Sequence, residues 1–208
     1  ECYAGLDLGS VNDFSSLVLA FHENDRTQLL PFFWIPEEKY RTRREMQREN
    51  ANIDVWVRQG LLRVTPGNVT DYEVIRRDIA RLAGQYDIRK IGYDRWNSSQ
   101  LVIDLQNDGL PMDGFQQSIS NISPPTKEFE RLARSGDLEH YGNPVLRWMV
   151  SNVVVYRDAN DNLKPVKNRS PEKIDGVVAA IEAIGEWMSA QRTPPARSIY
   201  EERGLRTF

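Results

Sequence analysis

The opening stretch of the chain places the strongest constraint on its fold. An apolar run over residues 2–8 reaches Asp7, a small-residue turn follows at 9–10, and a second apolar run covers 15–21. This pattern predicts a β-hairpin. Leucines flank Asp7 on both sides, so we expect the first strand to be central in its sheet. A carboxylate at that point needs a counter-charge to offset its desolvation, and a divalent metal ion is the partner that we expect.

Length and composition narrow the class of protein. A chain of 208 residues suffices for one substantial α/β domain. It begins at Glu1 and enters a strand at once, so we expect a domain of a longer protein. No apolar run approaches the roughly 18 residues of a membrane span. The single cysteine, Cys2, cannot form an internal disulfide, which fits a reducing, cytosolic setting. A formal charge of −3 argues against whole-surface attraction to nucleic acid, so such contact must come from local patches.

Hydrophobic periodicity predicts strands and helices flanking one mixed sheet. After the hairpin, strands are expected at 28–35, 61–64, 90–94 and 112–116, and helices at 42–59, 72–86, 97–107, 126–135, 144–155 and from Ser170 to Met188. Pro31 predicts an irregularity or an edge position in its strand. Pro124 and Pro125 are expected to break the chain before the helix at 126–135. Residues 156–169 resemble a small hairpin, and a polar tail follows residue 192.

Three aspartates stand where these elements end or begin. Asp7 ends the first strand, Asp94 ends the strand at 90–94, and Asp175 lies in the first turns of the last helix. If the two strands are neighbours, their carboxylates lie side by side and the helix can bring the third. Oxygen ligands favour Mg²⁺ or Mn²⁺. Two such ions, about 3.5–4 Å apart, can activate water and stabilise the leaving oxygen of a phosphodiester. The structural alternative is that each aspartate is only a turn former or a helix cap.

Several other charged residues have two interpretations each. Asp13 is expected to shape the hairpin turn, with metal contact as the alternative. Lys173, two residues before Asp175, is expected either to contact a phosphate or to be a solvated surface residue. The arginines at 41, 43, 44 and 48 are interpreted as a solvated helix face, with contact to a DNA backbone as the alternative. Lys164, Lys167 and Arg169 are expected along the return arm of the hairpin at 156–169.

Three segments together resemble a known family. GLDLGSVNDFSSLVLAF, IGYDRWNSSQLVIDLQNDG and NPVLRWMVSNVVVYRDANDNLKPVKNRSPEKIDGVVAAIEAIG are similar to the nuclease domain of the large terminase subunit of tailed bacteriophages. The resemblance runs from Tyr3 to Met188. It implies a ribonuclease H-like fold for residues 1–192 and metal-binding aspartates at positions 7, 94 and 175. The polar tail at 193–208 is expected to be mobile or to bind a partner. It also implies that the hairpin at 156–169 lies beside the active site, where its basic residues would meet DNA phosphates.

The resemblance further implies an activity and a setting. The family cuts concatemeric viral DNA during genome packaging with Mg²⁺ or Mn²⁺, in the host cytoplasm. Its expected partners are duplex DNA, an ATPase motor domain N-terminal to this chain, the small terminase subunit and the portal. We therefore expect a metal-dependent DNA endonuclease. The alternatives are another ribonuclease H-like nuclease, such as a junction resolvase, and a module that only docks on the motor, the portal or DNA.

Overall fold

A computed structural model describes residues 1–9, 13–45, 53–95 and 100–192. The strands are β1 (Cys2–Leu8), β2 (Ser15–Glu23), β3 (Arg26–Pro36), β4 (Arg63–Thr65), β5 (Ile88–Asp94), β6 (Met112–Phe115), β7 (Leu138–Glu139), β8 (Val155–Arg157) and β9 (Leu163–Pro165). The helices are α1 (Glu37–Glu45), α2 (Ile53–Arg58), α3 (Tyr72–Ala83), α4 (Gln100–Asn107), α5 (Ile119–Ser135), α6 (Pro144–Ser151) and α7 (Asp175–Arg192), with a 3-10 turn at Lys167–Arg169.

The main sheet has the strand order β4-β3-β2-β1-β5-β6, and β7 pairs with β3. β1 is antiparallel to β2 and parallel to β5, so it is central, as its flanking leucines predicted. Three antiparallel strands followed by parallel strands beyond β1 give the ribonuclease H-like arrangement that was expected. The neighbouring strands β1 and β5 carry Asp7 and Asp94.

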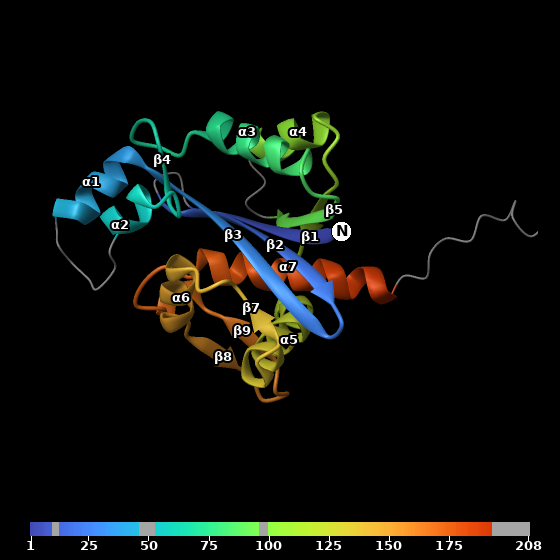
Figure 1. The fold of residues 1–208 in the computed structure, drawn as a ribbon. Helices are drawn as coiled ribbons and strands as arrows, with labels where there is room; N and C mark the ends of the chain where they lie inside the picture. Colours follow the sequence, from blue (N-terminus) through green and yellow to red (C-terminus); the bar gives the residue numbers. More distant parts are fainter. Residues whose placement is uncertain (10–12, 46–52, 96–99, 193–208) are drawn as a thin grey trace, which may run out of the picture.

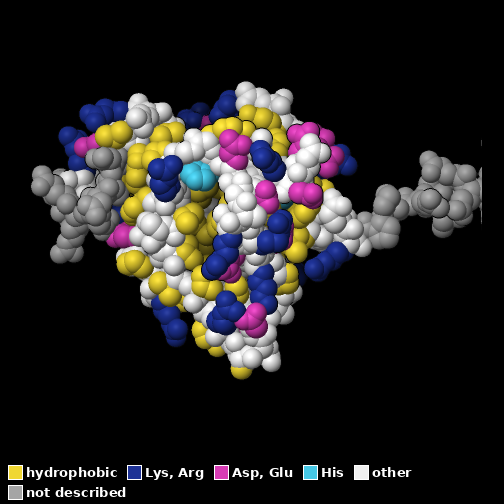
Figure 2. All heavy atoms as spheres, turned by 60° about the horizontal axis from the view of Figure 1, so that its bottom comes forward, with side chains coloured by type: hydrophobic (Ala, Val, Ile, Leu, Met, Phe, Trp, Pro, Cys, Tyr) yellow, Lys and Arg dark blue, Asp and Glu magenta, His cyan; other side chains and the backbone are white. Residues whose placement is uncertain are grey.

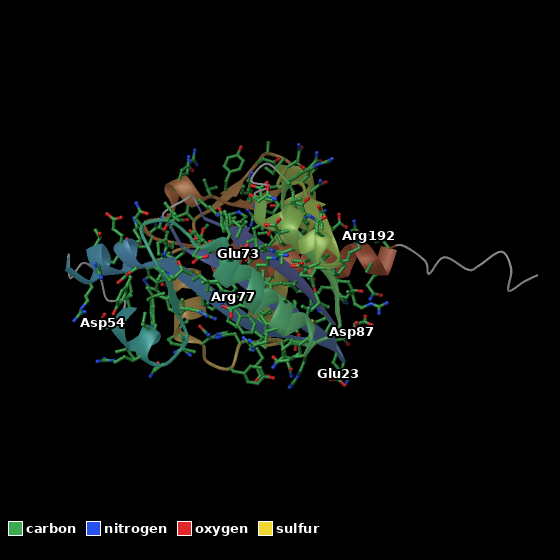
Figure 3. The ribbon with its side chains drawn as sticks, turned by 90° about the horizontal axis from the view of Figure 1, so that it is seen from above. Glu23, Asp54, Glu73, Arg77, Asp87 and Arg192 are labelled. Atoms are coloured by element: carbon green, nitrogen blue, oxygen red, sulfur yellow. The ribbon has the colours of Figure 1, made fainter. Side chains whose placement is uncertain are left out.

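Helices cover both faces of this sheet (Figure 1). α3 and α4 lie on one face and bury one apolar cluster with Leu6, Leu8 and Ile91. α5, α6 and α7 lie on the other face, where α7 packs along β1, β2 and β5. Seen from above, α3 lies over the sheet with Glu73 and Arg77 on its outer side (Figure 3). Among the described helices, none is long and apolar enough to cross a membrane.

The predicted break at the two prolines is wrong. α5 runs continuously from Ile119 through Pro124 and Pro125. Proline lacks the backbone N–H that a helix interior uses, and these two residues are the sixth and seventh of a helix of 17 residues. Pro125 is buried, and a side chain added at Gly185 of α7 would meet its ring at 3.4 Å. Packing of α5 on α7 outweighs the local preference against helix.

The last helix and the 156–169 hairpin also differ from the prediction. α7 begins at Asp175 instead of Ser170, because the Ser170 hydroxyl donates to the Val166 carbonyl and does not cap a helix. Strands β8 and β9 confirm the hairpin, but Lys167 and Arg169 follow it in the 3-10 turn. Only Lys164 lies on the return strand.

Smaller differences concern β3 and the region of the first helix. Pro31 lies within β3, opposite Val18 of β2, and on the other side of the strand it falls between the stretches that pair with β7 and with β4. The range predicted as one helix, 42–59, contains the end of α1 and all of α2. Residues 46–52, with Arg48, lie outside the described residues, as does the tail at 193–208.

Candidate metal centre

Asp7 and Asp175 meet across one ammonium group. Lys167 Nζ lies 2.5 Å from Asp7 Oδ2 and donates to Asp175 Oδ1 at 3.0 Å. Asp7 is 1% exposed and Asp175 is 5% exposed, whereas the Lys167 side chain is 43% exposed. The first strand and the last helix are thus joined, through Lys167, at the two aspartates that the sequence singled out.

Strand alternation sets the direction of Asp7 and Asp94. Leu6 pairs with Tyr93 across β1 and β5, and both pack in the cluster under α3 and α4. The next residue on each strand therefore faces the opposite side, which α7 covers. The negative charges of Asp175 and Asp94 both act on the Asp7 carboxyl. Asp7 and Asp94 thus lie at one end of the sheet, on the face that α7 covers, and Asp175 is the first residue of α7.

Burial dominates the electrostatics of this site. It raises the pKa of Asp7 to about 6, and the charges of Asp175 and Asp94 add to the shift while Lys167 opposes it. Burial alone would lower the pKa of Lys167, yet the two carboxylates raise it above its ordinary value. An ammonium flanked by two acids stays protonated at neutral pH, so a positive charge is built into the site.

The aspartate carboxylates of this site are suited to a hard divalent cation. Among the described residues, no three His, Cys, Asp or Glu side chains are already arranged around a single point. Asp7 Oδ1 and Asp175 Oδ2 are buried and accept no hydrogen bond from the described residues. Such oxygens are costly unless a cation or a donor meets them. All the candidate metal ligands are carboxylate oxygens, which Mg²⁺ and Mn²⁺ prefer. A metal ion would have to compete with the Lys167 ammonium for Asp7 and Asp175.

A cavity of about 530 Å³ opens beside these acids. Lys167 and Lys173 line it together with Asp13, Lys39 and Arg43. Lys173 pairs with Asp13, whose other oxygen accepts from the Phe14 N–H, so Asp13 shapes the turn as expected. Arg43 is bound to Glu172 at 2.9 Å with both side chains largely covered, so the solvated-face interpretation is wrong for that arginine.

The other two predicted DNA-binding residues lie outside this cavity lining. Lys164 donates to the Gln117 carbonyl at 2.8 Å, and the Arg169 guanidinium lies over the Tyr156 ring at 6.0 Å. On the face that carries α5, α6 and the β8–β9 hairpin, basic and acidic side chains are interspersed with apolar ones (Figure 2). This face bears no continuous basic patch, which agrees with the low net charge.

Sequence reasoning missed two polar side chains near the acids. Ser16 pairs with Asp7 across β1 and β2, and its hydroxyl is buried without a hydrogen-bond partner among the described residues. Glu182 of α7 is fully buried, and the charges of Asp7 and Asp94 act on it. The signal for Glu182 was its spacing of seven residues from Asp175, which returns to the same face of a helix.

Comparison with known proteins places this chain and its fold in a family. Residues 1–191 match the family model described as terminase large subunit, endonuclease domain. The large terminase subunit of Enterobacteria phage HK97 is 38% identical over 186 residues, which is 88% of this chain and 36% of that protein. Its crystal structure matches with a TM-score of 0.82 over 89% of this chain and 39% of the HK97 chain. Protein YmfN of Escherichia coli K12 is 29% identical, over 100% of this chain and 48% of YmfN.

A more distant structure shares the fold. The large terminase nuclease from thermophilic phage G20c with bound magnesium matches with a TM-score of 0.58 at 13% identity, over 89% of this chain and 80% of that one. The chain spans about a third to a half of the length of HK97 terminase and YmfN. With a family match over nearly every residue and a relative at 38% identity, the chain belongs to the family of terminase large-subunit endonuclease domains.

Proposed function

We propose that this domain is a metal-dependent endonuclease that cuts concatemeric duplex DNA by two-metal phosphodiester hydrolysis during viral genome packaging. The observation that carries the proposal is the meeting of Asp7 and Asp175 under α7, with buried oxygens that accept no hydrogen bond from the described residues. The magnesium bound to the G20c nuclease supports the choice of cation.

Asp7, Asp94 and Asp175, the acid cluster, would hold the ions, and the charges of the other two act on Asp7. Bound Mg²⁺ or Mn²⁺ would activate a water molecule and stabilise the leaving oxygen. The chain's own residues fix where this occurs: β1 and β5 hold two of the carboxylates on a rigid sheet, and α7 holds the third. Of the basic residues predicted to bind DNA, Arg169 is exposed and would meet a DNA phosphate, whereas Lys167 and Lys173 line the adjacent cavity and are each paired with an acid.

Cleavage of supercoiled plasmid with Mn²⁺, Mg²⁺ or EDTA tests the proposal. The unmodified chain is compared with Asp94→Ala and with Asp87→Ala, which changes an exposed aspartate just before β5. We expect metal-dependent cutting that Asp94→Ala abolishes and Asp87→Ala leaves intact. Binding of DNA without cutting in any metal, from a folded chain, would favour a docking module of the motor. A preference for four-way junctions over linear duplex would favour a resolvase.

The wider setting belongs to the same proposal. We infer that residues 1–192 form the nuclease domain and that the tail at 193–208 contacts a partner. The partners proposed are duplex DNA, an ATPase motor domain on the N-terminal side, the small terminase subunit and the portal, all in the host cytoplasm. Deletion of 193–208 with packaging still intact would reject the partner role of the tail.

A further inference from the structure

Helix α7 carries three acids in one row. Glu182 and Glu186 follow Asp175 by seven and eleven residues. At about 100° per residue, those offsets return to within roughly 20° of the same direction. All three side chains are buried, with exposures of 5% for Asp175, 0% for Glu182 and 4% for Glu186. The row therefore faces the sheet, where each carboxylate needs a partner.

Two glycines fix the position of this row over the strands. A Cβ on Gly5 would lie 2.0 Å from the Ala179 carbonyl oxygen, and a Cβ on Gly92 would lie 2.9 Å from Glu186 Oε1. Glu182 precedes Glu186 by about one turn, on the side of α7 nearer Asp175. It therefore lies beyond Gly92 toward Asp94, which agrees with the influence of Asp7 and Asp94 on its charge.

The two oxygens of Glu182 differ in their surroundings. Oε1 accepts from Gln117 Nε2 at 2.9 Å, and Lys164 in turn holds the Gln117 carbonyl. Oε2 is buried and accepts no hydrogen bond within the described part of the chain. One oxygen is thus held in place while the other remains available to a ligand in the acid cluster.

Glu186 provides the contrast. Its carboxylate lies 3.7 Å from the Lys90 ammonium, so it has a counter-charge within the protein. Glu182 forms no such ion pair with a described residue, although it is more deeply buried. Two acids on the same face of the same helix therefore differ in whether a lysine forms a direct ion pair with them. The charge of Lys167 acts on Glu182, but these two described residues form no ion pair.

We infer that Glu182 is a further oxygen ligand of the metal centre, acting through Oε2 together with Asp7 and Asp94. The inference rests on the proposed function and extends its acid set from three residues to four. A hard divalent cation would meet the buried oxygen that the protein leaves without a donor. Gln117 and Lys164 are then positioning residues, which orient Glu182 as outer-shell partners orient metal ligands.

Titration of the 208-residue chain with Mn²⁺, followed by calorimetry, tests this assignment. Glu182→Gln keeps the shape of the side chain and an acceptor for Gln117, but it replaces the carboxylate. Glu186→Gln makes the same change one turn away and is the matched control. We expect the Mn²⁺ affinity of Glu182→Gln to be at least about tenfold lower than that of the unmodified chain, and the affinity of Glu186→Gln to be unchanged. Melting in EDTA checks folding, and it should show Glu182→Gln to be no less stable than the unmodified chain, because one buried acid is gone.

A second variant tests the positioning of Glu182. Gln117→Ala retains the carboxylate and removes the bond that holds it, so Mn²⁺ affinity should fall by severalfold. Unaltered Mn²⁺ binding by both Glu182→Gln and Gln117→Ala would overturn the inference, as would an equal loss in Glu186→Gln. The proposed metal centre would then still stand. Absence of Mn²⁺ binding by the unmodified chain would instead overturn the metal centre and Glu182 with it.

Discussion

Lys167 Nζ lies 2.5 Å from Oδ2 of Asp7, a buried carboxylate of the central strand. The same ammonium donates to Asp175, so one cation offsets the repulsion between two acids that metal ions are proposed to bridge. If Lys167 and a divalent ion compete for the same oxygens, the lysine stabilises the metal-free chain and weakens binding of the metal.

Lys167→Met tests this competition. In EDTA the variant should be less stable by roughly 1–3 kcal/mol, a range reduced from that of fully buried pairs because the lysine is half exposed. Its stabilisation by Mn²⁺, measured as the rise in melting temperature, should be larger than in the unmodified chain. Lys173→Met, which removes a lysine paired with the single acid Asp13, is the control and should leave the Mn²⁺ effect unchanged. A smaller Mn²⁺ effect in Lys167→Met would mean that the lysine supports metal binding.

Glu186 should make stability depend on pH. Burial and the charge of Asp113 raise its pKa from an ordinary value near 4.5 to about 7, against the opposing effect of Lys90. An acid whose pKa is raised on folding stabilises the fold below pH 4.5, and this contribution is lost as the pH rises through 7. Denaturant unfolding of Glu186→Gln between pH 4 and 8 should lack this loss, which amounts to at most about 3 kcal/mol. Parallel pH curves for the variant and the unmodified chain would contradict the assignment.

Arg169 is the basic residue of the hairpin region most available to DNA. It is exposed, and it forms no ion pair with a described residue, whereas Lys167 and Lys173 are both paired with acids. Arg169→Ala should weaken duplex binding and reduce the slope of log affinity against log salt by about 0.9, the value for one phosphate contact. Arg89→Ala, which removes an exposed arginine at the far end of β5, is the control. An unchanged slope would remove Arg169 from the interface.

Gly5 allows α7 to approach β1. Because a Cβ there would overlap the Ala179 carbonyl, Gly5→Ala should destabilise the chain by about 3 kcal/mol or more, measured by denaturant unfolding. Gly84→Ala is the matched control: its φ of −74° suits alanine, and its nearest contact would be 3.5 Å away. That control should be neutral or stabilising by about 0.4–1 kcal/mol. Equal stability of the two variants would show that α7 can shift away from β1.

Much of this arrangement was predictable from local pattern. The alternation around Asp7 and the strand that ends at Asp94 are short-range signals, and β1 and β5 form as predicted. The helix at 72–83 was also predictable, because Asp71 caps it by accepting from the N–H groups of Glu73 and Val74.

Features that depend on long-range packing were not predictable in this way. Pro124 and Pro125 continue a helix because α7 packs against them, and no local rule contains that contact. Lys167 was expected to face DNA, yet it is bound to two acids from opposite ends of the sequence. Glu182 was overlooked because an acid in an apolar helix becomes informative only when the neighbouring strands are known.

The order of the acids along the chain has a consequence for synthesis. Asp7 lies in the first strand and Asp175 begins the last helix, so almost the whole domain must be translated before the two can meet. A chain released by the ribosome before residue 175 lacks both Asp175 and helix α7. The proposed cutting activity therefore requires α7 to be packed on the sheet, and a chain that ends before residue 175 would be unable to cut DNA through this site.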